Sequence, residues 1–369
     1  MTLSNLHLLR TAGVSPWSDQ ISRRMLDTGE LSRRIEEDAI TGVTSNPSIF
    51  AKAIVGTEDY DAQVGELAGR NASTNEIVTA VMTSDLQRAC DALRPVFDST
   101  DGRDGFVSVE VTPTLAHDTD ATVAEARQWV KHIDRPNLFV KVPATEAGLP
   151  AIRQLIGEGI SINITLIFSL QRYRKVMEAY LYGIQNYIDE GGDPSHVASV
   201  ASFFVSRMDT EVDRRLEEIG SDEALALRGK TAIANAQLAY REFLDTFNGL
   251  QWQRLVEQGA RIQKPLWAST STKNPGYPDT MYVEQLVAPH TVNTMPLETI
   301  DAYQDHGSEP VAFGPEEMAA AQSVIQRMDD VGVDYDDVMQ VLEDEGVEKF
   351  TASWNELIDD VEMERQKLQ

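Results

Sequence analysis

The feature that most constrains the fold is a repeated alternation of short apolar segments with longer amphipathic ones. Eight runs rich in β-branched and apolar residues occur, at 13–18, 39–45, 105–112, 137–143, 161–168, 197–204, 264–269 and 291–295. Intervening segments such as 120–133, 171–188 and 209–247 carry apolar residues at spacings of three and four, which is typical of surface helices. Strands that alternate with helices predict a parallel sheet. Eight such units predict an α/β fold of the (βα)8 barrel type, with an open doubly wound sheet as the alternative.

Two regions exceed a minimal barrel, namely 46–104 after the second strand and 297–369 at the C-terminus. Both have helical patterns, so additional helices are expected at both places. The last region is rich in Asp and Glu, but its apolar side chains still share one helix face; these are Phe350, Trp354, Leu357, Ile358 and Val361. We therefore predict a single (βα)8 barrel domain over 1–369, in which 297–369 is an acidic helical extension packed on the barrel.

The charge balance excludes several classes of partner. The chain of 369 residues has 59 acidic and 32 basic residues, a formal net charge of −27. Nucleic acids and anionic membranes would be repelled by this field, so neither is expected as a partner. A small anionic substrate would need local positive charge. A monomer and a homodimer are both compatible with the sequence.

Cysteine and histidine usage narrows the chemistry further. A single cysteine, Cys90, cannot form an intrachain disulfide, which fits a reducing compartment and predicts a cytoplasmic location. No secretory signal and no run of about 20 apolar residues is apparent. The six histidines are scattered without metal-ligand spacing, so we expect no metal.

Lys141 is the most unusual residue of the predicted strands. Strand side chains alternate between the two faces of a sheet, and in a barrel one face fills the interior. In 137–143 the outward set is apolar, which leaves Phe139 and Lys141 pointing inward. Burial disfavours an ammonium ion, so such a lysine can present a neutral amine that attacks a ketone and forms an iminium. The alternative is a lysine paired with a barrel carboxylate for structure alone.

The same alternation places polar groups beside Lys141 at the carboxyl ends of the strands, where barrel sites form. On the preceding strand Ser108, Glu110 and Thr112 are expected to face inward, with Glu110 beside Lys141 and able to relay protons. Asn163 and Thr165 follow on the next strand. Thr44 and Asn46 are expected inward as well, and suit the hydroxyls of a polyol, although an Asn before a proline is also a common turn residue.

Two cations near strand ends could hold an anionic group. Arg207 follows Ser202 and Phe204, and its planar guanidinium could bind a phosphate through two hydrogen bonds. The alternative for Arg207 is a salt bridge to Asp209 or Asp213. Lys273 is the second cation, and a solvated loop lysine is its alternative.

Four motifs resemble those of the transaldolase family, in particular its longer actinobacterial type. They are TSNPS (44–48), NLFVKVP (137–143), GISINIT (159–165) and WASTSTKNP (267–275). Their order and spacing are similar from about residue 15 to residue 296. Any one motif is moderately specific, whereas the four together are highly specific.

The resemblance implies a ketose phosphate bound to Lys141 as a Schiff base, with no cofactor. Asp19 would deprotonate the C4 hydroxyl and trigger retro-aldol cleavage, and Glu110 would position a water molecule. Ser202 and Ser269 match positions that contact the dihydroxyacetone fragment and the phosphate, respectively. The implied catalytic residues are Lys141, Glu110, Asp19 and Thr165. The implied substrate-binding residues are Asn46, Asn163, Ser202, Phe204, Arg207, Ser269 and Lys273.

The implied reaction transfers a dihydroxyacetone unit from sedoheptulose 7-phosphate or fructose 6-phosphate to glyceraldehyde 3-phosphate or erythrose 4-phosphate, in the non-oxidative pentose phosphate pathway. The chain departs from the family pattern in two places: Phe203 stands where proline is usual, and Lys273 stands near a usual arginine. Two alternatives remain. A fructose 6-phosphate aldolase would have glutamine and tyrosine in place of Glu110 and Phe204 and would be much shorter; a non-catalytic sugar-phosphate-binding barrel would keep the fold without the reaction.

Overall fold

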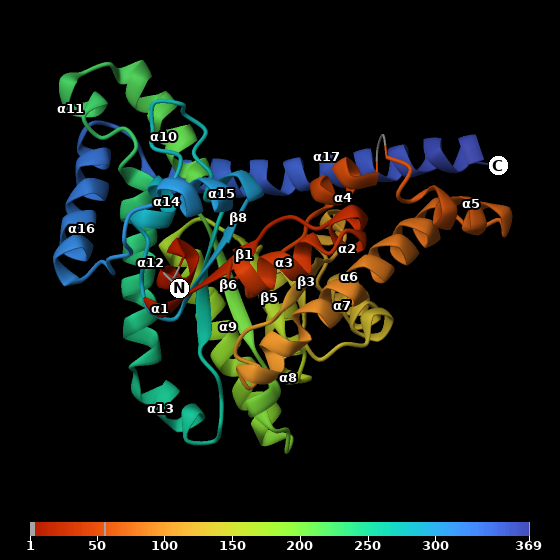
Figure 1. The fold of residues 1–369 in the computed structure, drawn as a ribbon. Coiled ribbons are helices and arrows are strands. Elements are labelled where there is room, and N and C mark those ends of the chain that lie inside the picture. The colour runs from red at the N-terminus through yellow and green to blue at the C-terminus, as the bar shows by residue number, and fades with distance from the viewer. Residues whose placement is uncertain (1–3, 55–56, 369) are drawn as a thin grey trace.

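In the computed structural model, which describes residues 4–54 and 57–368, eight parallel strands close into a barrel in sequence order (Figure 1). The strands are β1 (Val14–Ser18), β2 (Gly42–Val43), β3 (Val107–Glu110), β4 (Leu138–Pro143), β5 (Ile162–Ile167), β6 (Ser199–Phe204), β7 (Gln263–Ala268) and β8 (Thr291–Met295). Five residue pairs join β1 to β8 and complete the closure. The predicted (βα)8 barrel is thereby confirmed, and the open doubly wound sheet is wrong.

Helices surround the barrel and extend beyond it. From the N-terminus they are α1 (Asn5–Thr11), α2 (Arg23–Asp27), α3 (Glu30–Glu37), α4 (Pro47–Ile54), α5 (Asp61–Gly69), α6 (Thr74–Ser99), α7 (Thr119–Ile133), α8 (Gly148–Gly157) and α9 (Leu170–Asp189). They continue as α10 (Ser206–Ile219), α11 (Asp222–Leu225), α12 (Thr231–Phe247), α13 (Leu250–Val256), α14 (Met281–Glu284), α15 (Leu297–His306), α16 (Pro315–Asp330) and α17 (Tyr335–Leu368). None of the helices in the described ranges is long and apolar enough to cross a bilayer.

Most predicted segments match these elements, with two corrections. The segment 209–247 is three helices, because Gly220 adopts a left-handed conformation (φ 69°) and ends α10. The strand alternation predicts that Thr112 faces the barrel interior, and this prediction is wrong. Strand β3 ends at Glu110, and the Thr112 hydroxyl instead donates to Glu125 on α7, at 2.9 Å. The predicted domain limits at residues 1 and 369 lie outside the described residues.

An aromatic layer fills the amino end of the barrel. Trp17 and Phe139 point inward, each about 1% exposed, and the Phe139 ring stacks on Phe106 with centroids 4.0 Å apart. The indole of Trp17 leaves no space on the neighbouring strand, where a Cβ at position 42 would lie 2.3 Å from its Cε2 atom. Gly42 is therefore required by packing. Polar side chains are left to the opposite, carboxyl end.

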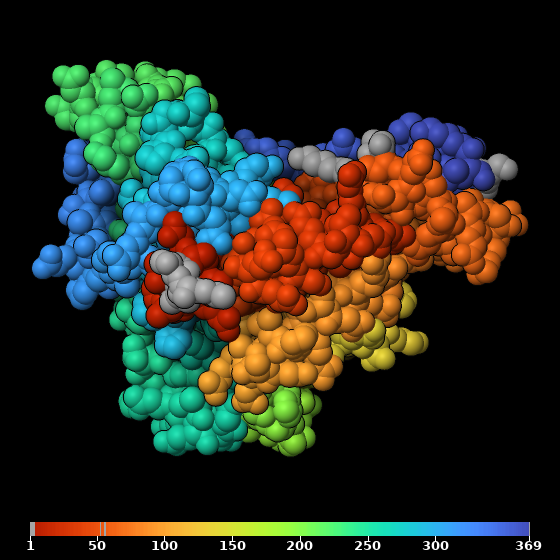
Figure 2. All heavy atoms as spheres, viewed as in Figure 1, coloured from red at the N-terminus to blue at the C-terminus, as the bar shows by residue number. Residues whose placement is uncertain are grey.

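The C-terminal helix α17 packs on the barrel and on the helices that follow β2. Helix α17 lies across the carboxyl end of the barrel, and its last turns lie beside α5 at the edge of the molecule (Figures 1 and 2). Leu357 and Val361 are fully buried. At Gly346 a Cβ would lie only 3.2 Å from Leu166, so the small residue lets α17 lie close to the end of β5. This crossing brings Phe350 over the barrel mouth.

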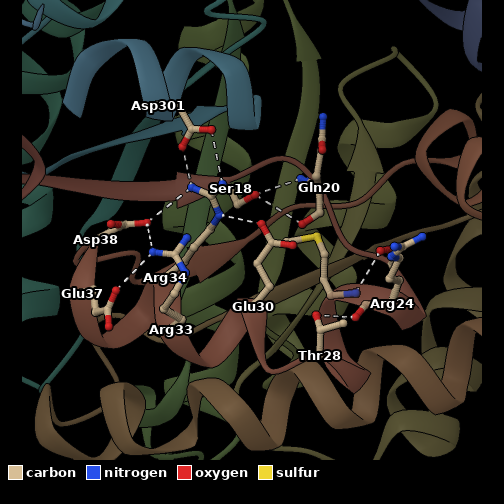
Figure 3. A network of polar contacts seen from close by, with 12 residues as sticks. Ser18, Gln20, Arg24, Thr28, Glu30, Arg33, Arg34, Glu37, Asp38 and Asp301 are labelled. Atoms are coloured by element: carbon tan, nitrogen blue, oxygen red, sulfur yellow. Dashed lines mark hydrogen bonds and ion pairs between the residues drawn. The ribbon is translucent and has the colours of Figure 1, made fainter. Parts of the chain in front are cut away.

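A charged network supports the seam where β1 meets β8. Arg34 on α3 is 5% exposed and bonds Asp301 on α15 at 2.8 Å, with Glu30 and Asp38 beside it (Figure 3). In the same view Ser18, the last residue of β1, bonds the backbone of Gln20 through its hydroxyl. This turn holds Asp19 at the carboxyl end of β1.

Candidate active site

Lys141 lies at the carboxyl end of the barrel, beside a cavity of about 190 Å³. Its side chain is 6% exposed, and Nζ lies 3.3 Å from Glu110 Oε2 and 3.2 Å from the carbonyl oxygen of Ser45. Glu110 and Lys141 are paired in register on β3 and β4, as the strand alternation predicted. The amine thus has a carboxylate partner, yet it also faces an enclosed space large enough for a small substrate fragment.

Glu110 is suited to carry a proton. Burial raises the pKa of its carboxyl, and the positive charges of Lys141 and Arg207 oppose this effect. A carboxyl whose pKa is raised exchanges protons more readily near neutral pH than an exposed one does. The pair can therefore move a proton between a bound reactant and the site.

A chain of hydrogen bonds continues from β3 to β6. Asn163 donates to Ser108 at 3.1 Å and accepts from Ser202 at 2.7 Å. Asn163 is fully buried, so its amide orients the two serine hydroxyls, of which Ser202 lines the cavity. Thr165 also lines the cavity, and its buried hydroxyl has no hydrogen-bond partner among the described residues. This hydroxyl is available to a substrate.

On the other side of the cavity, Thr44 and Asn46 lie in the segment between β2, which ends at Val43, and α4. Thr44 shares a hydrogen bond of 2.8 Å with Thr294 on β8. The Asn46 Oδ1 atom accepts from Ser48 and from the backbone of Ile49, so it holds the first turn of α4. Both Thr44 and Asn46 nevertheless line the cavity. Asn46 therefore both forms the turn before α4 and lines the cavity.

Arg207 is directed into the same cavity. Its predicted alternative, a salt bridge to Asp209 or Asp213, is wrong, because Asp209 accepts from Thr231, Ala232 and Tyr282 instead, while Asp213 accepts from Tyr277 and Gly229. Burial lowers the pKa of Arg207, opposed by Glu110 and Glu345. Its buried Nη1 atom has no hydrogen-bond partner among the described residues. A buried guanidinium with a free donor is suited to a bound anion.

Asp19, Ser269 and Lys273 stand at the cavity mouth. Ser269, at φ 56°, lies 2.8 Å from Ser206 through their hydroxyls, and Lys273 Nζ lies 2.6 Å from the Ser271 hydroxyl. Asp19 and Lys273 also line an outer cavity of about 660 Å³. The site therefore consists of a small inner chamber at Lys141 and a larger outer one that shares its entrance.

Comparison with known proteins decides the family. A family model described as Transaldolase/Fructose-6-phosphate aldolase matches residues 16–361. The chain belongs to this family. It is 53% identical over 355 residues to the "Transaldolase" of Mycolicibacterium smegmatis, covering 96% of each chain, and 55% identical over 349 residues to that of Acidothermus cellulolyticus, covering 95% of this chain and 94% of the relative. It is 51% identical over 366 residues to "Transaldolase 2" of Streptomyces avermitilis, covering 98% of each.

The sequence patterns did not assign Phe350 to the site, nor four other residues that line the inner cavity, namely Ala268, Ser271, Thr294 and Pro296. Phe350 lines the inner cavity together with Phe204, and the two rings lie 6.4 Å apart. Lys141 Nζ is 5.7 Å from the centre of the Phe350 ring, and the Arg207 guanidinium carbon is 5.5 Å from it. The helix pattern assigned Phe350 to the packing face of the extension, which is correct but incomplete. No local signal distinguishes it from Leu357 on the same face.

Proposed function

We propose that this chain is a transaldolase that transfers a three-carbon ketol unit between sugar phosphates through a Schiff base on Lys141. The observation that carries the proposal is a buried primary amine beside a carboxylate and an enclosed cavity, in a chain that matches proteins named transaldolase over nearly its whole length. The substrates, the roles of individual residues and the absence of a cofactor are parts of the proposal.

The first step is formation of the Schiff base. The neutral Lys141 amine adds to the C2 carbonyl of the ketose phosphate, and the resulting carbinolamine loses water to give an iminium ion. Protons must reach the leaving oxygen during this step. Glu110, 3.3 Å from Nζ, and the Thr165 hydroxyl at the cavity wall are the groups that serve this transfer.

The second step breaks the C3–C4 bond. Asp19 accepts the proton of the C4 hydroxyl, the C4 carbonyl forms, and the bonding electrons move into the iminium to give an enamine. The shortened aldose phosphate leaves, while the three-carbon enamine stays on Lys141. A second aldose then enters, and the same steps run in reverse. Asp19 stands at the wall shared by both cavities, which suits a group that acts on the boundary between the retained and the departing fragment.

Substrate recognition follows the division of the site. The inner cavity of about 190 Å³ would hold the ketol fragment, with Ser202, Asn46 and the Asn163 network orienting its hydroxyls. Arg207, Ser269 and Lys273 would hold the phosphate at the mouth. Sugar phosphates are charged esters that occur inside cells, and the cytoplasmic location expected from the sequence remains part of this proposal.

The experiment that tests the proposal is reductive trapping. Wild-type protein is mixed with fructose 6-phosphate and borohydride, and peptide mass spectrometry should find a reduced dihydroxyacetone adduct at residue 141. The Lys141→Met variant, which keeps a side chain of similar length, should fold normally and gain no adduct. A wild-type protein that stays unmodified would be a non-catalytic sugar-phosphate-binding barrel, and an adduct at another lysine would remove Lys141 from the mechanism.

A second measurement separates transfer from lysis. With fructose 6-phosphate alone a transaldolase should release at most one glyceraldehyde 3-phosphate per site, whereas adding erythrose 4-phosphate should start continuous formation of sedoheptulose 7-phosphate. Continuous release of free dihydroxyacetone at the same rate without an acceptor would instead indicate the aldolase-type lyase.

A further inference from the structure

A second cavity, which we call the basal cavity, opens at the amino end of the barrel, opposite Lys141. Its volume is about 670 Å³, and strands β1, β4, β6, β7 and β8 all contribute to its wall. Trp17 and Phe139 form its inner end. Phe139 precedes Lys141 by two residues on β4, and Trp17 on β1 precedes Asp19, which directly follows that strand, by two residues. The aromatic layer therefore separates the basal cavity from the active site. A ligand in one cavity would not occupy the other.

Three basic residues line the basal cavity: Arg103, Arg261 and Lys264. Lys264 Nζ donates to the carbonyl oxygen of Arg103 at 3.0 Å, and the Arg261 guanidinium donates to the carbonyl of Gly102. These contacts hold the Arg261 and Lys264 side chains against the backbone of residues 102 and 103 at the rim. In residues 4–54 and 57–368, neither Arg261 nor Lys264 forms an ion pair with a carboxylate.

One carboxylate, that of Asp101, also lines the basal cavity, and it offsets the three basic residues only in part. Asp101 lies 4.0 Å from Arg103, and the side chains of this pair are 85% and 74% exposed, so water screens their attraction. Burial lowers the pKa of Arg261, and the charge of Arg103 lowers it further, against the opposing charges of Asp101 and Asp193. The basal cavity therefore keeps a local positive field.

This field contrasts with the rest of the molecule. The chain has a formal net charge of −27, and two other partly buried arginines, Arg34 and Arg172, are paired with carboxylates. His290 lines the same cavity as Lys264, and burial and the charge of Lys264 lower the pKa of its imidazole. Positive side chains that lie close together repel one another, and this repulsion raises the free energy of the protein. A bound anion would lower it again.

The remaining wall of the basal cavity is largely apolar. Phe106, Ala260 and Ile262 line it, and Val256 at its edge is 47% exposed. Small-molecule sites in proteins commonly measure about 300–1,000 Å³ and combine apolar walls with a few polar groups that fix orientation. The volume and lining of the basal cavity match this description. Its basic residues favour a negatively charged ligand.

We propose that the basal cavity binds a small organic anion with an apolar body, its phosphate or carboxylate held by Arg261 and Lys264 and its body against Phe106 and Ile262. This ligand differs from the polyhydroxylated substrates of the active site, because the apolar wall offers a sugar few hydrogen-bond partners. The proposal does not depend on the proposed function.

Isothermal titration with 1-naphthyl phosphate tests this site. The probe should bind to the Arg207→Gln variant, whose active-site phosphate ligand is removed, with one molecule per chain. Arg261→Gln or Lys264→Gln, each added to that variant, should weaken binding by at least about tenfold, because a charge-assisted contact to the phosphate is lost. Arg254→Gln is the matched control, since it removes the same charge from an exposed position on α13 outside the basal cavity.

Inorganic phosphate and 1-naphthol, titrated separately, should each bind at least about tenfold more weakly than the combined probe, because each engages half of the site. The proposal is overturned if 1-naphthyl phosphate fails to bind Arg207→Gln, or if neither Arg261→Gln nor Lys264→Gln weakens it. Equal affinity for inorganic phosphate would equally overturn it, since the apolar wall would then contribute nothing. The hydrogen bond that Lys264 donates lies at the protein surface, so Lys264→Gln should fold normally. This variant still tests the site if Arg261→Gln perturbs folding.

Discussion

Two side chains of the active site have buried polar atoms without a hydrogen-bond partner among the described residues. Thr165 and Arg207 each present a buried polar atom without a protein partner in the described part of the chain, and both face the inner cavity. A buried polar group that is left unsatisfied costs roughly 1–3 kcal/mol. The fold retains this cost at a place where a hydroxylated, phosphorylated substrate would satisfy both atoms.

Arg207→Gln should therefore weaken phosphate recognition specifically. We expect kcat/KM for fructose 6-phosphate to fall by about 10- to 100-fold, mainly through KM, because a charge-assisted hydrogen bond of about 1.5–3 kcal/mol is removed. Activity with free dihydroxyacetone as donor and unphosphorylated glyceraldehyde as acceptor should change little, since neither compound has a phosphate. Steady-state kinetics with both donors check this, and equal losses would remove the phosphate role of Arg207.

At the scale of elements, α17 determines how enclosed the inner cavity is. It reaches the mouth because Gly346 allows close contact with Leu166, and it delivers Phe350 next to Lys141, Arg207 and Phe204. An apolar ring at this position limits the access of water to a carbanion-like intermediate.

Phe350→Ala should let water reach the Lys141 enamine. We expect the release of free dihydroxyacetone without an acceptor to increase at least about tenfold relative to transfer, because the protonated enamine hydrolyses before an aldose arrives. Trp354→Ala is the control, as Trp354 lies one turn further along α17 and outside the inner cavity. A similar increase in both variants would indicate general loosening of the helix. Phe350→Leu tests the same idea with a smaller loss of packing.

Asp209 on α10 joins α12 and α14 through Thr231, Ala232 and Tyr282, and burial raises its pKa from 3.8 to about 6. Because the folded-state pKa is the higher one, the protonated form stabilises the fold below about pH 4, and this contribution is lost as pH rises through 6. The rise in pKa corresponds to about 3 kcal/mol. Relative to wild type, Asp209→Asn should therefore gain stability between pH 4 and pH 7.

Thermal unfolding at a series of pH values measures this difference for Asp209→Asn. Asp245→Asn, a change at an exposed position on α12, serves as the control and should keep a constant difference from wild type across the same range. A constant difference for Asp209→Asn as well would mean that Asp209 titrates normally in the folded protein.

For the whole molecule, the dominant electrostatic feature is repulsion among the acidic residues, with a formal net charge of −27. Surface ion pairs, many of them between residues three or four apart on one helix, oppose this repulsion locally. Exposed pairs of this kind contribute little individually. The long-range repulsion should therefore exceed their sum.

Raising KCl from about 0.1 to about 1 M shortens the screening length from about 10 to about 3 Å and should stabilise the protein. A gain of about 1 kcal/mol would raise Tm by about 2 °C in a protein of this size. Calorimetry in KCl measures this, and sucrose series serve as the control for solute exclusion without screening. A lower Tm in KCl would mean that attractive ion pairs dominate instead.

The sequence predicted the position of a side chain where apolar residues repeat every two positions in a strand or about every 3.6 positions in a helix. Alternation within 137–143 and 105–112 placed Lys141 and Glu110 on the same side of neighbouring strands, and the 3.3 Å contact between them agrees. It failed at Thr112, where the strand had already ended and the hydroxyl turned to Glu125. Alternation predicts the face of a residue only while the strand continues.

The sequence alone determined the alternating strands and helices, the excess of negative charge, and the motifs that carry the amine and its polar neighbours, because these depend on residues close together in the chain. Tertiary structure alone decided that β1 closes on β8, that Phe350 from α17 covers Lys141, and that Arg103, Arg261 and Lys264 gather around the basal cavity. These contacts are between residues far apart in the chain. They form through packing across the barrel, and no local sequence pattern predicts that packing.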